Sequence, residues 1–318
     1  MEKILLSMVL VILVGVFLYG AVMFFAINNF NSYESTLAVD KENNILSSDE
    51  ESIKILQLTD LQTKNLFECA MAYPTVKRLV KENQPDLIVL TGDNVSNGSD
   101  RKVVSALISL FDSFKIPWAL VLGNHDHSDY VSEDEMSKMF EESEYGIYKT
   151  GNIDNKHGNY YYKLSLGGEI VRTLIFLDDS DYMFSNDQLA WYENIISDVS
   201  DEQNRIVPSF VFFHIPIPEF LDAHEIYKED SSIGTGVMGE RPSVQDENSG
   251  FFELVKKIGS TDAIFCGHDH YNNTILNYQG VLLCYGMKTG YTVTYDRERV
   301  GGNLITVSSD EFVVERVK

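Results

Sequence analysis

Cysteine is scarce in this sequence of 318 residues, which contains only Cys69, Cys266 and Cys284. Three cysteines so far apart can form neither a disulfide framework nor a zinc knuckle, because zinc ligands recur at short fixed spacings. We therefore expect all three to be buried, unpaired thiols. Cysteine usage leaves the cellular compartment undecided.

Basic residues are also in short supply, since 25 Lys and Arg stand against 48 Asp and Glu and give a formal net charge of -23. Nucleic-acid binding needs clustered Lys and Arg that face the phosphates, so a general basic surface is excluded. A nuclease would need a basic track for the backbone, and the sequence has no obvious one. We expect an acidic, soluble domain with no nucleic-acid partner.

One long hydrophobic run is present, from Ile4 to Ile27. It is long enough to span a bilayer and predicts a transmembrane signal anchor at residues 1–28. The weak charge bias favours the amino end inside, which places the rest of the chain outside the cytoplasm of a single-pass cell-membrane protein. The alternative is a cleaved signal peptide that releases a secreted form, but a small-residue cleavage site is not clear.

The remainder divides into a short polar segment and one large domain. Residues 29–51 are rich in Asn, Ser, Glu and Asp, which is typical of a polar stalk or linker. Over residues 52–318, apolar strands alternate with helical periodicity and predict an α/β domain with a largely parallel core, closed by antiparallel strands after Thr274. Residues 215–250 lack clear periodicity, and we expect this loop to set specificity.

A short polar cluster follows each of five apolar runs, at the carboxyl end of the expected strand. Ligands bind outside these ends in open α/β sheets, so the clusters are expected to converge. Five of the seven His residues belong to them, which chance explains poorly. The clusters are Thr59-Asp60-Leu61-Gln62, Gly92-Asp93-Asn94, Gly123-Asn124-His125-Asp126-His127, His214 and Gly267-His268-Asp269-His270.

In this order the clusters resemble the signature of the calcineurin-like metallophosphoesterases, which runs Asp-x-His, Gly-Asp, Gly-Asn-His-Asp/Glu, His and Gly-His-x-His. The resemblance covers the chain from about Ile53 to its carboxyl end. Two further segments, Asn248-Ser249-Gly250 and residues 286–290, resemble the branch related to small purple acid phosphatases. The fold that the resemblance implies is a metallophosphoesterase-type, four-layer α/β/β/α sandwich.

The resemblance also implies two metal positions that share Asp93. The first would be held by Asp60, Gln62, Asp93 and His270, and the second by Asp93, Asn124, His214 and His268. Two divalent ions against two carboxylates leave a net positive centre, which suits a hydroxide and a phosphate ester. Mn²⁺ is the favoured ion, with Mg²⁺, Zn²⁺ or iron as alternatives.

The reaction implied is hydrolysis of a phosphate monoester or diester by a hydroxide that bridges the two ions. His125 would protonate the leaving oxygen or bind the phosphoryl group, and Asp126 is either its orienting partner or an ordinary turn residue. The anchor implies a phosphorylated small-molecule or extracellular substrate. Lys288 and Arg241 could neutralise substrate phosphate, but we expect both to be solvated surface cations.

Two positions depart from the family pattern. Gln62 stands where the family usually has His, and its harder, weaker amide oxygen should favour Mn²⁺ or Mg²⁺ and loosen the first metal position. Ser96 stands where purple members have the Tyr that binds ferric iron, so we expect no tyrosinate charge-transfer band. Gln62 also leaves open an alternative, a catalytically weak or inactive membrane-tethered module that binds metal or phosphate. Retention of His125 argues against it.

Overall fold

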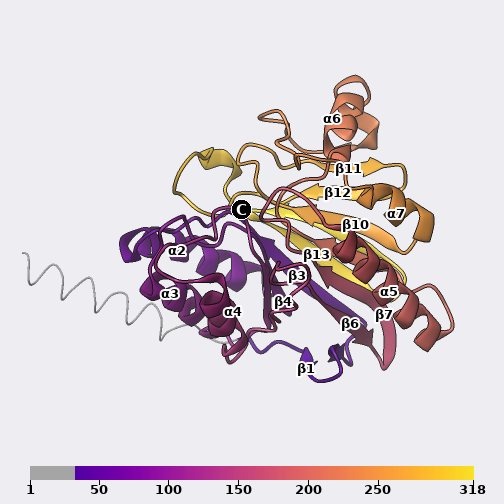
Figure 1. Ribbon diagram of the computed structural model, residues 1–318, viewed down its shortest axis with the longest axis horizontal. Coiled ribbons are helices and arrows are strands. Elements are labelled where there is room, and N and C mark those ends of the chain that lie inside the picture. Colours follow the sequence, from indigo (N-terminus) through magenta and orange to yellow (C-terminus); the bar gives the residue numbers. More distant parts are fainter. Residues whose placement is uncertain (1–32) are drawn as a thin grey trace, which may run out of the picture.

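Short apolar runs form the strands of two β-sheets in the computed structural model of this chain, which describes residues 33–318 (Figure 1). The predicted anchor, residues 1–28, lies outside the described residues. Among residues 33–318, no helix is both long and apolar enough to cross a membrane. The predicted α/β domain with two sheets is confirmed.

The first sheet has five strands in the order β14-β13-β3-β4-β5. Its strands β3, β4 and β5 run parallel, so their carboxyl ends lie at one edge, and β13 and β14 extend the sheet in antiparallel fashion. The bounds are β3 Ser52–Leu58, β4 Leu87–Thr91, β5 Trp118–Val121, β13 Gly302–Ser308 and β14 Phe312–Val317.

The second sheet has nine strands in the order β1-β2-β6-β7-β8-β10-β12-β11-β9. Its centre is parallel, because β7, β8, β10 and β12 pair in the same direction. The bounds are β1 Ala38–Asp40, β2 Ile45–Ser48, β6 Tyr160–Leu166, β7 Glu169–Phe176, β8 Ser209–Phe212, β9 Gly234–Thr235, β10 Thr261–Cys266, β11 Ile275–Tyr278 and β12 Val281–Tyr285.

Helices cover the outer face of each sheet (Figure 1). Successive side chains of β8 and the residue after it point to opposite faces of the nine-stranded sheet. Phe210 and Phe212 pack between the two sheets, while Val211 and Phe213 pack under the helices. On the first sheet lie α2 (Leu66–Asn83), α3 (Arg101–Asp112) and α4 (Glu133–Glu141). On the second lie α5 (Asn186–Gln203), α6 (Glu219–Glu229) and α7 (Phe251–Ile258), and two 3₁₀ turns occupy Ser231–Ile233 and Arg297–Arg299.

The segment predicted as a polar stalk, residues 29–51, differs from that prediction in its described part. Strands β1 and β2 form a hairpin there, and β2 pairs with β6 at the edge of the nine-stranded sheet. The buried Asp86 carboxylate accepts hydrogen bonds from Tyr33 Oη at 3.1 Å, Thr36 Oγ1 at 2.8 Å and the Lys54 N–H at 2.9 Å. Polar composition alone hides such pairing, because it depends on partners distant in sequence.

The segment predicted as a long aperiodic loop, residues 215–250, contains structure of its own. It holds α6, a 3₁₀ turn and β9, and α6 buries Phe220 and Ala223. Its last part is tied to the loop that follows β7, where Gln245 Nε2 donates to the Asp179 carboxylate at 2.9 Å. The three cysteines are buried and unpaired, as predicted.

Candidate metal centre

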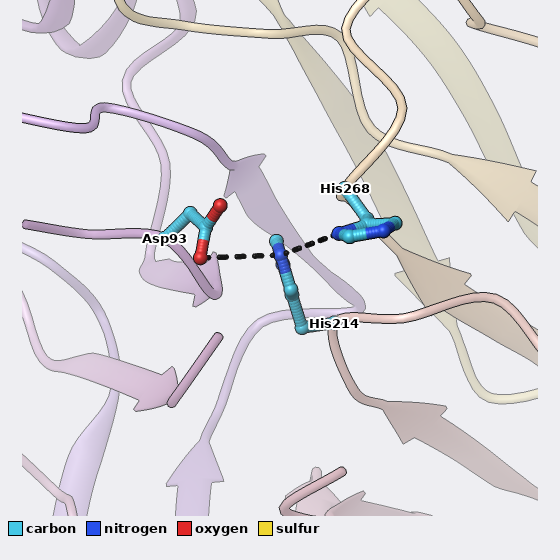
Figure 2. A group of neighbouring side chains, drawn as sticks. All are labelled: Asp93, His214 and His268. Carbon is cyan, nitrogen blue, oxygen red and sulfur yellow. Dashed lines mark hydrogen bonds and ion pairs between the residues drawn. The ribbon is translucent and has the colours of Figure 1, made fainter. Parts of the chain in front are cut away.

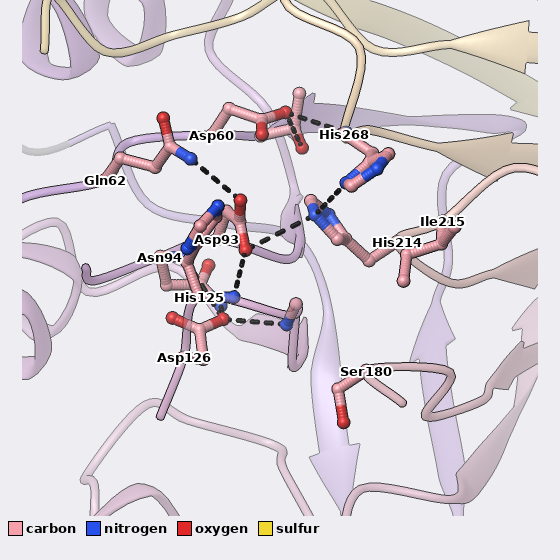
Figure 3. Close-up of polar contacts among 12 residues, drawn as sticks. Asp60, Gln62, Asp93, Asn94, His125, Asp126, Ser180, His214, Ile215 and His268 are labelled. Carbon is pink, nitrogen blue, oxygen red and sulfur yellow. Dashed lines mark hydrogen bonds and ion pairs between the residues drawn. The ribbon is translucent and has the colours of Figure 1, made fainter. Parts of the chain in front are cut away.

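The polar segments that follow β3, β4, β5, β8 and β10 meet in one place, where the carboxyl ends of the parallel strands of both sheets come together (Figure 3). Two groups of side chains there place possible ligand atoms within 4.8 Å of one another. One group is Asp93, His214 and His268, and the other is Asp60, Asp93 and His270 (Figure 2 shows the first). Asp93 belongs to both groups.

Glycines of the sequence motifs allow this close approach. A Cβ atom at Gly92, whose φ is +86°, would lie 2.4 Å from the His214 ring. A Cβ atom at Gly123 would lie 2.3 Å from both the main-chain nitrogen and Oδ1 of Asp93. Because no side chain fits at either position, Gly-Asp and Gly-Asn-His-Asp act as spacing motifs that bring Asp93 and His214 together.

The backbone is left-handed at four of the predicted ligand positions, Asp60, Gln62, Asp93 and His268, with φ between 47° and 75°. Such conformations cost free energy in residues other than glycine and persist where surrounding contacts enforce them. Main-chain hydrogen bonds supply that enforcement, from Asp60 N–H to Gly92 O at 3.1 Å and from Gln62 N–H to Asp93 O at 2.8 Å. The loops are therefore locked together.

The group around His214 has the donors that a divalent cation requires. His214 Nδ1 lies 2.8 Å from the carbonyl oxygen of Thr91, which leaves Nε2 to face the centre. That Nε2 atom lies 3.3 Å from both Asp93 Oδ1 and His268 Nδ1. Asn124 Oδ1 is buried and accepts no hydrogen bond from the described residues. A buried oxygen without a partner needs a ligand, so these residues fit one metal ion.

The group around Asp60 is less complete. Asp60 Oδ2 accepts hydrogen bonds from Thr59 Oγ1 at 2.8 Å and the His268 N–H at 3.1 Å. Its Oδ1 atom is buried, accepts no hydrogen bond from the described residues and lies 3.4 Å from His270 Nε2. His270 Nδ1 is 2.8 Å from Thr294 Oγ1, which fixes the ring. Asp60, Asp93 and His270 thus offer three donors for an ion at the first metal position.

Gln62, predicted as a fourth ligand of this group, turns its amide elsewhere. Gln62 Nε2 donates to Asp93 Oδ2 at 2.8 Å, and Gln62 Oε1 accepts from Lys288 Nζ at 2.7 Å. An ammonium group only donates and a carboxylate only accepts, so this amide orientation alone satisfies both neighbours. The amide oxygen therefore does not fit a metal at this position.

Lys288, expected on the surface, is buried, with 1% of its area exposed. Its ammonium group also donates to the main-chain oxygen of Asp60 at 3.0 Å. Burial lowers the pKa of Lys288 to about 8, although the Asp60 and Asp93 carboxylates pull it upward. The expectation of a solvated cation was wrong because the loop that carries Lys288 folds under the metal centre.

Charge compensation holds the centre together. Burial would raise the pKa of both Asp60 and Asp93, but neighbouring histidines hold the pKa of each carboxyl below its usual range. Burial lowers the pKa of His214, but the Asp93 carboxylate outweighs it and raises that pKa to about 10. The pKa of His268 falls to about 4, through burial and the charge of His214. Cations are favoured here and further anions are not.

His125 and Asp126 play different parts. The His125 N–H donates to Asp93 Oδ1 at 2.8 Å, and its half-buried ring takes part in no hydrogen bond with the described residues. The buried Asp126 carboxylate accepts from the N–H groups of Gly123 at 2.9 Å, Asn94 at 3.2 Å and Val95 at 2.8 Å. Asp126 therefore ties two motif loops together and, within residues 33–318, makes no hydrogen bond to the His125 ring.

Replacement of Asp126 by Ala is expected to lower the free energy of unfolding by about 2–3 kcal/mol, because buried N–H groups lose their acceptor. Urea unfolding followed by circular dichroism measures the loss. The exposed Asp129→Ala in the same loop is the control and should change stability little. A variant with unchanged stability but a much lower kcat would instead mean that Asp126 orients His125.

Asp179 is a site residue that motif reasoning missed. It follows β7, and its carboxylate accepts from the N–H groups of His214 and Ile215, each at 3.0 Å. Burial raises its pKa to about 7, opposed by His214 and Gln245. The one sequence signal was its position just past an apolar run, which the other clusters share. Asp179 thus couples the His214 loop to the segment that carries Gln245.

Known proteins resemble this chain in sequence and in fold. The family model described as calcineurin-like phosphoesterase matches residues 53–272. Probable inactive purple acid phosphatase 29 of Arabidopsis thaliana is 28% identical in an alignment that covers 75% of this chain and 72% of that protein. Phosphatase DCR2 of Saccharomyces cerevisiae is also 28% identical, over 75% of this chain but 48% of its own length.

A solved structure supports the fold independently of sequence. A dimetal phosphatase from Danio rerio superposes on 83% of this chain and 95% of its own, with a TM-score of 0.58 and 12% identity. Identity this low shows a shared fold and carries no residue roles.

Proposed function

The chain belongs to the calcineurin-like phosphoesterases, a family of hydrolases, and from this premise we propose that it hydrolyses a phosphate ester with divalent metal bound at the candidate metal centre. The observation that carries the proposal is the pair of ligand groups that share Asp93. Buried oxygens of Asp60 and Asn124 that accept no hydrogen bond within residues 33–318 point to cations as their partners. His125 lies beside Asp93, to which its N–H donates (Figure 3).

Asp93, Asn124, His214 and His268 would hold one ion, and Asp60, Asp93 and His270 surround the position of another. Divalent ions there would neutralise phosphate charge and supply a water-derived nucleophile near neutral pH. The oxygen and imidazole donors are compatible with Mn²⁺, the ion we favour. The protein itself fixes the orientation of the histidine ligands, because Thr91 O hydrogen-bonds the His214 ring and Thr294 Oγ1 hydrogen-bonds the His270 ring.

His125 is the proposed proton donor. Its main chain is held by Asp93, while its ring has no hydrogen-bond partner among the described residues and so remains available to substrate. A ring in this position can protonate the leaving oxygen or hydrogen-bond a phosphoryl oxygen. The substrate would be a phosphorylated small molecule or an extracellular ester, met outside the cytoplasm by a domain held on the predicted anchor.

A second candidate function is a weakly active or inactive module that binds metal or phosphate. One observation favours it, namely that the Gln62 amide is engaged by Lys288 and Asp93 and is withheld from metal. The Arabidopsis thaliana relative is also named as a probable inactive phosphatase. Against it stands the His125 ring, which makes no hydrogen bond to residues 33–318 and which metal binding alone does not require.

Turnover separates the two candidates. The full chain in detergent is stripped with EDTA, reloaded with Mn²⁺, and assayed on an aryl phosphate and an aryl phosphodiester. The enzyme is supported by turnover that appears with Mn²⁺ and disappears again with EDTA. Bound Mn²⁺ without turnover of either ester would favour the binding module.

A further inference from the structure

Three buried side chains form a chain of charge-assisted hydrogen bonds at the first metal position. Lys288 Nζ donates to Gln62 Oε1 at 2.7 Å, and Gln62 Nε2 donates to Asp93 Oδ2 at 2.8 Å (Figure 3 draws the second contact). All three residues are at most 2% exposed. Hydrogen bonds to charged groups in such surroundings are strong, so the arrangement is a fixed part of the centre.

These hydrogen bonds remove Gln62 as a ligand of the first metal position. For Gln62 Oε1 to bind a cation, the amide must turn over, which would place its NH₂ group against the Lys288 ammonium and its oxygen near the Asp93 carboxylate. Both contacts are repulsive. The oxygen of Asp93 that would face the first position, Oδ2, is already engaged by Gln62, whereas Oδ1 faces His214.

The same hydrogen bonds hold the positive charge of Lys288 beside the first metal position. The Lys288 ammonium contacts the main-chain oxygen of Asp60 at 3.0 Å and lies on the Asp60 side of the centre. A fixed cation there stabilises the two carboxylates and repels a second cation, most strongly because the site is buried. Contact with substrate phosphate is a poorer account of Lys288, since its ammonium group is enclosed and directed at protein oxygens.

We propose that Lys288, acting through Gln62, replaces the charge of the ion at the first position, so that this chain binds one divalent ion tightly and not two. The tight ion occupies the group of Asp93, Asn124, His214 and His268, whose donors are complete. One divalent ion and one ammonium against two carboxylates still leave a positive centre. This inference rests on the proposed metal binding and narrows its stoichiometry.

Metal stoichiometry tests the inference without reference to activity. The EDTA-stripped full chain is titrated with Mn²⁺ by calorimetry, and its electron paramagnetic resonance spectrum is recorded at saturation. We expect one tightly bound ion per chain and the six-line spectrum of isolated Mn²⁺. Two ions in one centre would lie about 4 Å apart and give a coupled spectrum.

The matched variant restores the family residue and removes the cation. Lys288→Met with Gln62→His is expected to bind two ions and to show the coupled spectrum. Lys228→Met, which removes an exposed lysine of α6, is the control and should keep one ion. If the double variant does not fold, Gln62→His alone should raise affinity at the first position at least tenfold.

Two results would overturn the inference: a wild-type chain that binds two ions with affinities within tenfold of each other, or variants that gain no second ion. Failure here is distinct from failure of the proposed function. Two tight ions with turnover overturn the inference and leave the hydrolase standing. One tight ion without turnover of either ester does the reverse.

Discussion

Replacement of Asp93 by Asn is expected to remove tight Mn²⁺ binding and to lower kcat for an aryl phosphate by about 10³-fold or more, which corresponds to roughly 4 kcal/mol. Asp93 is the one carboxylate common to both ligand groups. Both of its oxygens also accept hydrogen bonds, Oδ1 from the His125 N–H and Oδ2 from Gln62 Nε2. An Asn loses the charge and turns an NH₂ group against one of these donors.

The measurement is bound Mn²⁺ per chain together with kcat at saturating metal. Asp198→Asn, which removes one exposed carboxylate of α5, is the matched control and should keep both values near wild type. A variant at Asp93 with full metal content and more than a tenth of wild-type kcat would contradict the assignment of Asp93 as the shared ligand.

The location of the centre could be predicted from the sequence because its causes are local. Each apolar run ends in a polar cluster, and parallel strands place such ends at one edge of a sheet, so Asp60 and Asp93, which follow the paired strands β3 and β4, had to lie near each other. His214 follows β8 of the other sheet and joins them where the carboxyl ends of the two sheets come together. The glycines of the motifs can also be recognised in the sequence. A Cβ atom at Gly92 would collide with His214, and one at Gly123 would collide with Asp93. Periodicity and motif spacing therefore sufficed to find the centre.

The orientation of groups within the centre could not be predicted, because it depends on packing between distant segments. Gln62 was expected to offer its oxygen to metal. That oxygen instead accepts a hydrogen bond from Lys288, which lies 226 positions further along the chain. Asp126 could be read as an orienting or a turn residue until the structure showed that its carboxylate accepts hydrogen bonds from the loop N–H groups.

The same limit explains the polar segment before β3. Its composition is that of a linker, yet β2 pairs with β6, and Asp86 holds Tyr33 and Thr36. Pairing at a sheet edge satisfies main-chain groups and needs little apolar surface, so hydrophobic pattern does not report it. Helix α6 was missed for the related reason that its buried face is narrow.

Replacement of His125 by Ala is expected to lower kcat by about 10²- to 10⁴-fold, the usual range for loss of a proton donor, while Mn²⁺ content and melting temperature stay unchanged. The ring makes no hydrogen bond to the described residues, and only its main-chain N–H contacts Asp93, so truncation leaves the ligand set in place. His127→Ala, which removes an exposed ring paired with Glu133 at 3.1 Å, is the control in the same loop.

Leaving groups of different basicity distinguish the two roles proposed for His125. An alkoxide leaves poorly without a proton, whereas a nitrophenolate leaves readily unprotonated, so loss of a proton donor should slow the alkyl ester far more than the nitrophenyl ester. Loss of a phosphoryl hydrogen bond should slow both esters equally, because the group it contacts is the same in each. Equal loss would assign His125 to phosphate binding, and wild-type rates on both esters would remove it from the reaction altogether.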